Sequence, residues 1–362
     1  MTKQQHHHRR QRSCLALSLC LLLLWCLLPF AVSAATTTLQ SQSNNNNNAT
    51  DNAKNRHNGG KNHDQHDDSS LTLRIIHITD VYTLENFASL QTLVRETKSR
   101  DRHADDDHHS KNGSGNIRTI SMLTGDFLMP YLLSTIDGGR GMMAMINALQ
   151  IDYLTWGNHE KDLPLHHLME REREYKGTWI NSNMPSHPTV SNSTCQKEYE
   201  IISLSSSSTT TTTTSQSGVT DTNPHHTRRI GMIGILTNAP SLYPPDGKFH
   251  GATIQDPYER MHYYDAVLPQ QENTDMILPI CHFYEAQDER TAREFHSSFP
   301  LILGGHDHHI VERRLHGHEN STTLLLKPGS DAHFANIVEL HWQNSSSPRT
   351  PEISHRMVDV RQ

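Results

Sequence analysis

The sequence predicts an α/β domain in which mainly parallel strands form the sheet and helices cover its outer faces. Between residues 71 and 342, short apolar runs rich in β-branched residues alternate with longer segments whose apolar residues recur at helical spacing. This alternation is typical of parallel strands joined by helical crossovers. Polar residues gather directly after several of the runs, which is where folds of this class bind their ligands.

Apolar runs that end at Gly, Pro, Asn, Asp or another polar residue are predicted as strands. In chain order they are residues 71–79, 117–124, 151–156, 178–183, 199–204, 228–236, 274–281, 299–305, 322–329 and 335–342. Helical spacing appears in residues 86–98, 141–150, 163–175, 257–268 and 285–296.

Low-complexity segments divide the chain into regions. Residues 35–70 are rich in Asn, His and Asp and hold almost nothing apolar, so we expect a disordered linker. The folded domain is then 71–362, with low-complexity insertions at about 101–116 and 205–222, because strand-like or helical patterns resume after each. The histidines of these tracts are interpreted as solvated rather than metal-binding.

Residues 1–34 have the features of a secretory signal peptide. Arg9, Arg10 and Arg12 precede the apolar run 15–32, and small residues at the end of that run predict cleavage after Ala34. The alternative is that the run stays as a membrane anchor, with the rest of the chain outside the cytosol. The sequence also holds five Asn-x-Ser/Thr acceptor sites for glycans, at Asn48, Asn112, Asn192, Asn320 and Asn344. These sites favour a secreted or lumenal glycoprotein.

Charge and cysteine content exclude several classes of protein. The chain has 32 Lys and Arg against 39 Asp and Glu, and losing the four basic residues of the signal leaves 28 against 39, or −11. Nucleic acid and anionic membranes are therefore poor partners, although an anionic substrate fits if a metal supplies positive charge. Only Cys195 and Cys281 follow the signal, so there is no disulfide framework, and either one bridge or two free thiols is compatible with the sequence.

Residues that bind metals well stand directly after five predicted strands. Because parallel strands end at the same edge of a sheet, we expect these residues to converge although more than 200 residues separate the first from the last. They are Asp80, Asp126, Asn158 with His159, His282, and His306 with His308.

Carboxylate, amide and imidazole donors together suit two divalent ions such as Zn²⁺, Mn²⁺ or Fe²⁺. Two such ions about 3.5–4 Å apart hold a bridging hydroxide and clamp both ends of a displacement at phosphorus. A carboxylate must bridge the ions to keep them that close, and Asp126 is the candidate.

The motifs "LTGD" (123–126), "GNHEKD" (157–162) and "GGHDHH" (304–309) resemble those of the calcineurin-like metallophosphoesterases, within them the 5′-nucleotidase branch. The resemblance covers roughly residues 71–360 and implies a four-layer αββα sandwich. Residues 327–340 look like the strand pair that closes the family's catalytic domain.

The resemblance also implies roles for single residues. One metal is assigned to Asp80, Asp126 and His308, and the other to Asp126, Asn158, His282 and His306. His159 and Asp162 match a catalytic His-Asp pair that stabilises charge on the phosphate or its leaving group. A carboxylate beside an imidazole keeps it oriented and more readily cationic, which agrees with that role.

The first motif of the family is usually Asp-x-His, whereas this chain has Tyr82 at the ligand position, as in a nucleotidase-like subgroup that also reads Asp-Val-Tyr. A phenol with a pKa of about 10 binds as phenolate only to a strongly acidic ion such as Fe³⁺. The alternative is that Tyr82 packs or hydrogen-bonds beside a looser metal site.

Other polar residues near the motifs receive structural interpretations. Glu160 is expected to be a charge at a helix entry, and Asp288 and Glu289 to be charges at the start of the helix after His282. His77 and Cys281 are expected to be buried in the core.

The predicted activity is hydrolysis of phosphate monoesters, 5′-nucleotides among them, in a single-domain enzyme. Nucleotidases of this type carry a second, C-terminal domain that binds the base, and the sequence ends at Gln362, where the catalytic domain is expected to close. Two alternatives stay open: a phosphodiesterase such as a 2′,3′-cyclic nucleotide hydrolase, and an inactive binding protein with the same fold. The sequence says nothing about oligomeric state.

Overall fold

The computed structural model describes residues 70–106, 116–190, 195–206, 226–317 and 321–362. The predicted signal peptide, nearly all of the predicted linker and the acceptor sites at Asn48, Asn112, Asn192 and Asn320 lie outside these ranges. Asn344 lies within them, half-buried in the turn between the last two strands. In the described part of the chain no helix has the length and apolar character needed to cross a membrane.

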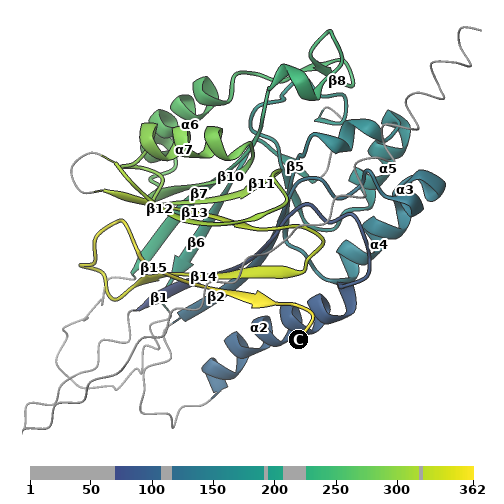
Figure 1. Cartoon of the computed structure of the whole chain (residues 1–362). Coiled ribbons are helices and arrows are strands. Elements are labelled where there is room, and N and C mark those ends of the chain that lie inside the picture. The colour runs from purple at the N-terminus through teal and green to yellow at the C-terminus, as the bar shows by residue number, and fades with distance from the viewer. Residues whose placement is uncertain (1–69, 107–115, 191–194, 207–225, 318–320) are drawn as a thin grey trace, which may run out of the picture. The chain divides into compact units, whose positions relative to one another are not determined.

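One sheet has seven strands in the order β15-β14-β1-β2-β3-β4-β5 (Figure 1). Strands β1 to β5 are parallel, whereas β14 pairs antiparallel with β1 and β15 pairs antiparallel with β14. Their bounds are β1 Leu71–Ile78, β2 Asn116–Thr124, β3 Tyr153–Thr155, β4 Thr178–Ile180, β5 Gln196–Lys197, β14 Phe334–Trp342 and β15 Glu352–Asp359.

The second sheet has six strands in the order β12-β13-β11-β10-β7-β6. Its four central strands are parallel, and the edge strands β6 and β12 are antiparallel to their neighbours. The bounds are β6 Tyr199–Ser205, β7 Thr227–Leu236, β10 Met276–His282, β11 Leu301–Gly305, β12 Ile310–His316 and β13 Thr322–Pro328. A separate hairpin pairs β8 (Lys248–Phe249) with β9 (Ala252–Thr253).

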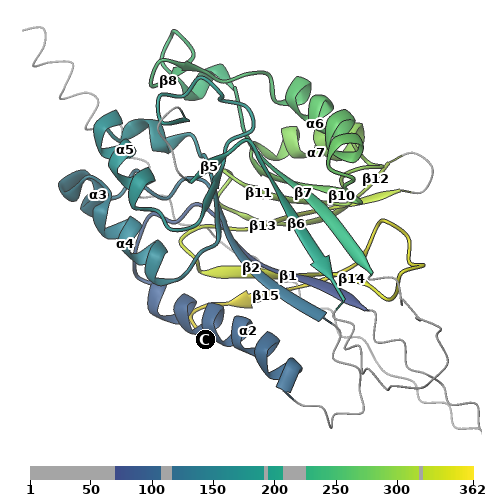
Figure 2. The same ribbon diagram turned by 180° about the vertical axis from the view of Figure 1, so that it is seen from behind.

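Helices cover the outer face of each sheet, so the predicted four-layer αββα sandwich is confirmed (Figures 1 and 2). The seven-stranded sheet carries α2 (Phe87–Asp106), α3 (Leu132–Asp137), α4 (Arg140–Ala148) and α5 (Leu165–Glu174), and the six-stranded sheet carries α6 (Pro257–Gln271) and α7 (Glu285–Glu294). Short 3-10 helices span His159–Asp162 and Pro240–Leu242.

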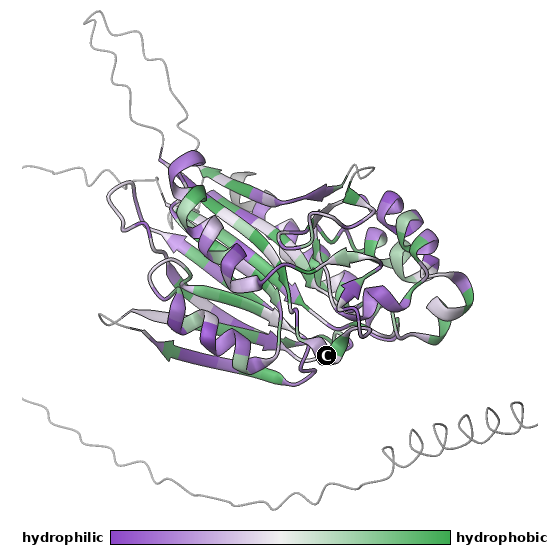
Figure 3. Ribbon diagram, turned by 90° about the horizontal axis from the view of Figure 1, so that it is seen from above, coloured by the Kyte–Doolittle hydropathy of each residue, from purple (hydrophilic) through white to green (hydrophobic). Residues whose placement is uncertain are grey.

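The core consists of three apolar layers, because every central strand is buried on both faces. Alternate residues of β10 show this: Leu278 and Ile280 pack between the two sheets, whereas Ile277 and Cys281 pack against α6 and α7. Figure 3 shows the corresponding distribution, with hydrophobic residues along the strands and hydrophilic residues prominent on the helices.

Every predicted helix and strand has a counterpart, but the predicted bounds were wrong at one insertion. Residues 101–106 belong to α2 rather than to a loop, and Asp101 joins β1 to β2 by pairing with Arg74 at 2.9 Å and accepting the Thr119 N–H at 2.8 Å. The described strands β12 and β15 were not predicted, because as edge strands they expose polar side chains on most positions.

The expectation that residues 327–340 form a strand pair was also wrong. β13 lies in the six-stranded sheet and β14 in the seven-stranded sheet, so the two strands face each other across the sandwich and form no ladder together.

Candidate metal centre

The predicted site residues converge at the carboxyl ends of strands from both sheets. Asp80, Asp126 and Asn158 follow β1, β2 and β3, whereas His282 ends β10 and His306 follows β11. The sequence placed them along the edge of a single sheet. They lie together because the parallel strands of both sheets end on the same side of the sandwich.

The backbone at this site is strained. Asp80, Asp126, His306 and His308 have φ values of 51°, 53°, 87° and 59°, in the left-handed region that non-glycine residues rarely adopt. Each such residue costs on the order of 1–2 kcal/mol, which packing elsewhere must offset. These strained residues lie in the loops that direct the polar side chains of the site toward one another.

Gly157 allows the loops after β2 and β3 to touch. A Cβ at this position would lie 2.1 Å from Asp126 Oδ1 and 2.3 Å from the Asp126 nitrogen. The same Oδ1 accepts the His159 N–H at 2.7 Å. Glycine is therefore required here for close approach of the two loops.

A first group of metal-ligand atoms comes from Asp80, Asp126 and His308, whose donor atoms lie within 4.8 Å of one another. His308 Nε2 is 3.3 Å from Asp80 Oδ1. Both carboxylates are fully buried, whereas His308 is about half exposed, so this group opens to solvent on one side.

A second group comes from Asp126, His282 and His306, and it shares Asp126 with the first. His282 Nδ1 donates to the Thr124 carbonyl at 2.8 Å, which turns its Nε2 toward Asp126 Oδ2, 3.1 Å away. Burial alone would lower the pKa of His282, but the charges of Asp126 and Asp80 outweigh it and raise that pKa to about 10. The buried carboxylates therefore favour a positive charge at this point.

Unpaired buried atoms mark the same place. Among the described residues, Asn158 Oδ1 and His306 Nδ1 are buried without a hydrogen-bond partner, whereas His282 Nε2 faces Asp126 Oδ2. Unpaired buried polar atoms are costly, and these two are an amide oxygen and an imidazole nitrogen. The donor set fits a borderline metal ion such as zinc, manganese or iron.

Tyr82 points its hydroxyl into the first group. The oxygen lies 3.0 Å from Asp126 Oδ2, 2.8 Å from His308 Nε2 and 3.4 Å from Asp80 Oδ1. Tyr82 is thus in direct contact with the cluster.

His159 and Asp162 form a hydrogen-bonded pair at the rim. His159 Nδ1 lies 2.6 Å from Asp162 Oδ2, and Lys161 Nζ holds the other carboxylate oxygen at 2.8 Å. The hydrogen bond to Asp162 is the main cause that raises the pKa of His159. Burial opposes ionisation of Asp162, but the bonds from His159 and Lys161 outweigh it and lower the pKa of that carboxyl.

Glu160, expected to be a charge at a helix entry, stands in the first turn of the 3-10 helix His159–Asp162, but its role goes beyond that. It is fully buried, and Oε2 accepts the N–H groups of Gly157 at 2.7 Å and Asp126 at 3.0 Å. Its Oε1 accepts from Phe127 at 2.8 Å and Leu128 at 3.1 Å. Glu160 therefore clamps the two loops that carry Asp126 and Asn158. A carboxylate inside a Gly-Asn-His motif was the signal available in the sequence.

Asp288 stands in the first turn of α7, as expected from the sequence, and it is also fully buried under the site. Lys327 Nζ lies 2.6 Å from Asp288 Oδ2 and 2.5 Å from Asp307 Oδ2, and it donates to the carbonyls of Phe283 and Gly305. This buried ammonium ties the ends of β10, β11 and β13 together beneath the turn that carries His306 and His308. Sequence reasoning did not single out Lys327.

The remaining structural interpretations agree with the structure. His77 is fully buried, with Nε2 3.0 Å from Thr124 Oγ1, and Cys281 is fully buried on the face opposite His282. Cys195 and Cys281 are both buried, and they form no disulfide with each other.

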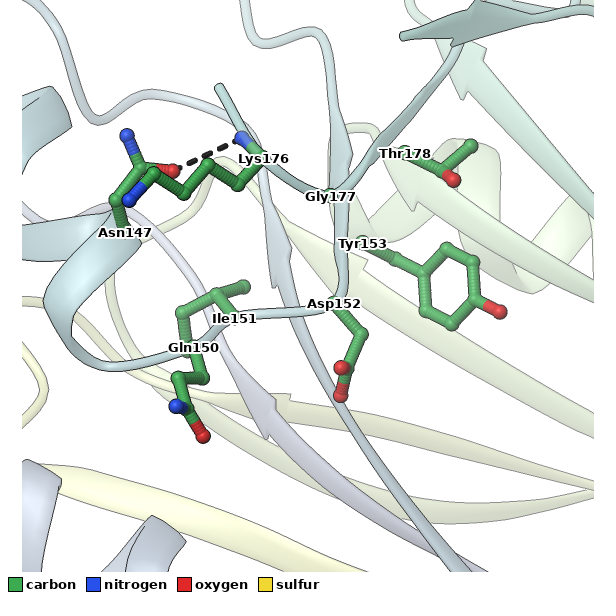
Figure 4. A pocket seen from close by; sticks show the side chains of 8 residues that line it. All are labelled: Asn147, Gln150, Ile151, Asp152, Tyr153, Lys176, Gly177 and Thr178. Carbon is green, nitrogen blue, oxygen red and sulfur yellow. Dashed lines mark hydrogen bonds between the residues drawn. The ribbon is translucent and has the colours of Figure 1, made fainter. Parts of the chain in front are cut away.

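A cavity of about 460 Å³ lies at the opposite end of the sandwich, where β3 and β4 begin. Figure 4 shows Asn147, Asp152 and Tyr153 in its wall, with the Lys176 N–H donating to Asn147 Oδ1 at 2.9 Å. Its lining includes none of the predicted site residues.

No protein-family model matches the chain. One curated relative, the trifunctional nucleotide phosphoesterase protein YfkN of Bacillus subtilis (strain 168), is 20% identical over 313 residues, which cover 83% of this chain and 20% of that protein.

Similar solved structures include the Haemophilus influenzae NAD nucleotidase NadN, with a TM-score of 0.58 and 16% identity over 80% of this chain and 49% of NadN. A 5′-nucleotidase precursor from Thermus thermophilus has a TM-score of 0.56 and 15% identity, over 79% of this chain and 54% of the other. The calcineurin-like phosphoesterase YfkN from Bacillus subtilis has a TM-score of 0.56 and 14% identity, over 81% of this chain and 92% of the crystallised one.

The chain therefore has the fold of the calcineurin-like phosphoesterases. It spans about half of the two nucleotidase chains and a fifth of the curated relative.

Proposed function

We propose that this protein is a metal-dependent phosphoesterase that hydrolyses phosphate monoesters of small organic molecules, nucleotides among them. The observation that carries the proposal is the pair of donor groups that share Asp126, beside the His159–Asp162 pair. Asp80, Asp126 and His308 would hold one metal ion, and Asp126, Asn158, His282 and His306 the other. The unpaired atoms of Asn158 and His306 support this assignment.

When bound, two such ions lower the pKa of water and stabilise negative charge at phosphorus. The protein's own residues would supply position and a proton. The backbone N–H of His159 fixes one oxygen of Asp126, and the Thr124 carbonyl fixes the tautomer of His282 with its Nε2 inward.

His159 and Asp162 would act on the substrate. Asp162 orients the imidazole and favours its cationic form, so that His159 stabilises the phosphoryl oxygens or protonates the leaving oxygen. The side chain of His159 is 34% exposed, which leaves it accessible to a phosphate entering from solvent.

The substrate proposal rests on chemistry and on the names of the relatives, which describe a nucleotide phosphoesterase and an NAD nucleotidase. We further propose that residues 71–362 form the catalytic domain and that residues 1–34 direct it to the secretory pathway, where Asn344 would accept a glycan. Asn344 is half-buried in the turn between β14 and β15, with its Oδ1 accepting the Ser346 N–H at 2.9 Å.

The proposal is tested on the purified protein by metal content per chain and by turnover of p-nitrophenyl phosphate, beside bis-p-nitrophenyl phosphate as a diester. We expect about two metals per chain and faster monoester turnover, with activity but not metal content lost in His159→Ala. Faster diester turnover would favour the phosphodiesterase. Fewer than two metals and no turnover after Mn²⁺ or Zn²⁺ is supplied would show a binding protein instead.

A further inference from the structure

Lys161 contacts the His159–Asp162 pair in a way that its place in the chain does not require. The three residues belong to the 3-10 helix His159–Asp162, in which residues three apart, such as His159 and Asp162, lie on one face. Adjacent residues of a helix point in different directions. Lys161 Nζ nevertheless lies 2.8 Å from Asp162 Oδ1, so the long side chain bends back toward the face that carries the pair.

The ion pair of Lys161 with Asp162 is partly shielded from solvent. The Lys161 side chain is 15% exposed and the Asp162 side chain is 36% exposed. An ion pair between fully exposed side chains contributes little because water and salt screen it, whereas a partly buried pair is screened less. The contact can therefore restrict the carboxylate of Asp162.

Each oxygen of the Asp162 carboxylate has its own partner. Oδ2 lies 2.6 Å from His159 Nδ1, and Oδ1 accepts from Lys161 Nζ. The torsion that turns an aspartate carboxylate is broad, so a single hydrogen bond leaves the group free to rotate. One donor on each oxygen fixes the plane of the carboxylate. With Lys161 in place, Asp162 holds the imidazole of His159 by Nδ1 and leaves Nε2 facing away.

The other contacts of His159 do not fix its ring. The backbone N–H of His159 donates to Asp126 Oδ1 at 2.7 Å, which holds the main chain but not the imidazole. The ring of Tyr82 lies edge-on to it, with centroids 6.2 Å apart. Within the described ranges, Asp162 is the side chain that hydrogen-bonds the imidazole. The orientation of His159 thus depends on Asp162, and that of Asp162 on Lys161.

We propose that Lys161 is a positioning residue, which acts through Asp162 to hold the imidazole of His159 toward the phosphate of the substrate. This inference rests on the proposed function, since it concerns the same reaction. In this role Lys161 touches neither the substrate nor a metal ligand. Its loss should therefore lower kcat and leave KM unchanged.

The test compares variants of the full chain, loaded with Mn²⁺ and assayed with p-nitrophenyl phosphate at one pH. Lys161→Met removes the charge but keeps a long apolar side chain, and we expect kcat to fall about 10-fold with KM and metal content unchanged. Lys161→Arg should return kcat to within about threefold of the wild type, because a guanidinium also donates to a carboxylate oxygen. In an Asp162→Asn background, Lys161→Met should cause no further loss, because both residues act through one series of contacts.

Lys98→Met is the matched control. Lys98 Nζ lies 2.6 Å from Asp152 Oδ2, and the two side chains are 17% and 37% exposed, so this ion pair resembles that of Lys161 with Asp162. Asp152 lines the cavity at the opposite end of the sandwich. Loss of the control pair should cost similar stability in urea and leave kcat unchanged.

The outcomes separate this inference from the proposed function. If the wild type is active and kcat of Lys161→Met stays within about twofold of it, the inference is overturned and the proposed function stands. A raised KM with unchanged kcat also overturns the inference, by placing Lys161 in contact with the substrate. A further loss in the Asp162→Asn background overturns it because Lys161 then does not act through Asp162. If the wild type hydrolyses no ester, both fail.

A crystal structure of Lys161→Met distinguishes loss of position from misfolding. We expect the domain to be intact and the Asp162 carboxylate to have turned away from His159 Nδ1. An unchanged contact between Asp162 and His159, in a variant with reduced kcat, would overturn the positioning role.

Discussion

Substituting alanine for Gly157 should disable both metal-ligand groups at once. The added Cβ would stand 2.1 Å from Asp126 Oδ1, whereas ordinary contacts begin at 3.4 Å, so a displacement of about 1.3 Å is required. Asp126 is the residue that both groups share. Neither loop can yield easily, because Glu160 binds the N–H groups of Gly157 and Asp126 together.

The size of the effect follows from this geometry. Overpacking of this kind costs about 1–3 kcal/mol of unfolding free energy. A misplaced shared ligand should weaken metal binding by at least the roughly 10–100-fold seen when only the supporting partner of a ligand is removed. Converted to free energy, that weakening is about 1.4–2.7 kcal/mol or more, so the loss of metal binding should be at least comparable with the loss of stability.

Isothermal titration with Zn²⁺ or Mn²⁺ and urea unfolding measure the two quantities. Gly247→Ala is the matched control: φ at Gly247 is 66°, but nothing lies within 4 Å of the added Cβ. It should cost about 1–2 kcal/mol through backbone strain alone and leave metal affinity unchanged. If Gly157→Ala binds metal within threefold of the wild type, the close approach of the two loops does not position Asp126 and the reasoning is refuted.

Three further predictions concern buried and rim charges. Lys327→Met should lower the free energy of unfolding, measured in urea, by about 3–5 kcal/mol, because it leaves buried carboxylates without a compensating charge. Adding Asp288→Asn should restore part of this loss. A loss below about 1 kcal/mol in Lys327→Met would contradict the prediction. Asp162→Asn should reduce kcat by about 10²-fold and leave the metal content unchanged. Because Asp162 raises the pKa of His159, the alkaline limb of the pH–rate profile should also move to lower pH in this variant. If the limb does not move, His159 is not the cation whose titration limits the rate. Burial, and next the neighbouring His250, lower the pKa of His187 to about 3 in the folded protein. As the pH falls below about 6.5, His187 is therefore protonated in the unfolded chain before it is protonated in the folded protein. The free energy of unfolding should decrease between about pH 6.5 and pH 3 as a result. His187→Phe should reduce the slope of unfolding free energy against pH in that window by up to about 1.4 kcal/mol per unit, and an unchanged slope would show that His187 is not the group responsible.

The predictable part of the fold came from local patterns. Strands such as β1, β7 and β10 are mostly apolar because both of their faces are largely buried, and this is visible without knowledge of their partners. The edge strands β12 and β15 were missed because half-exposed edges carry too few apolar residues to be distinguished from loops.

The sequence by itself determined which residues gather at the site, because a polar residue after a parallel strand must stand at the edge where neighbouring strands end. It did not determine that two sheets share the site, since strand order depends on pairing between distant segments. Only the tertiary structure gave Glu160 and Lys327 their roles, because burial and backbone partners decide whether a charged residue faces solvent or clamps two loops. It also brought the Tyr82 hydroxyl against Asp80, Asp126 and His308, which stand 2 to 226 residues away in the chain and meet only where the two sheets end.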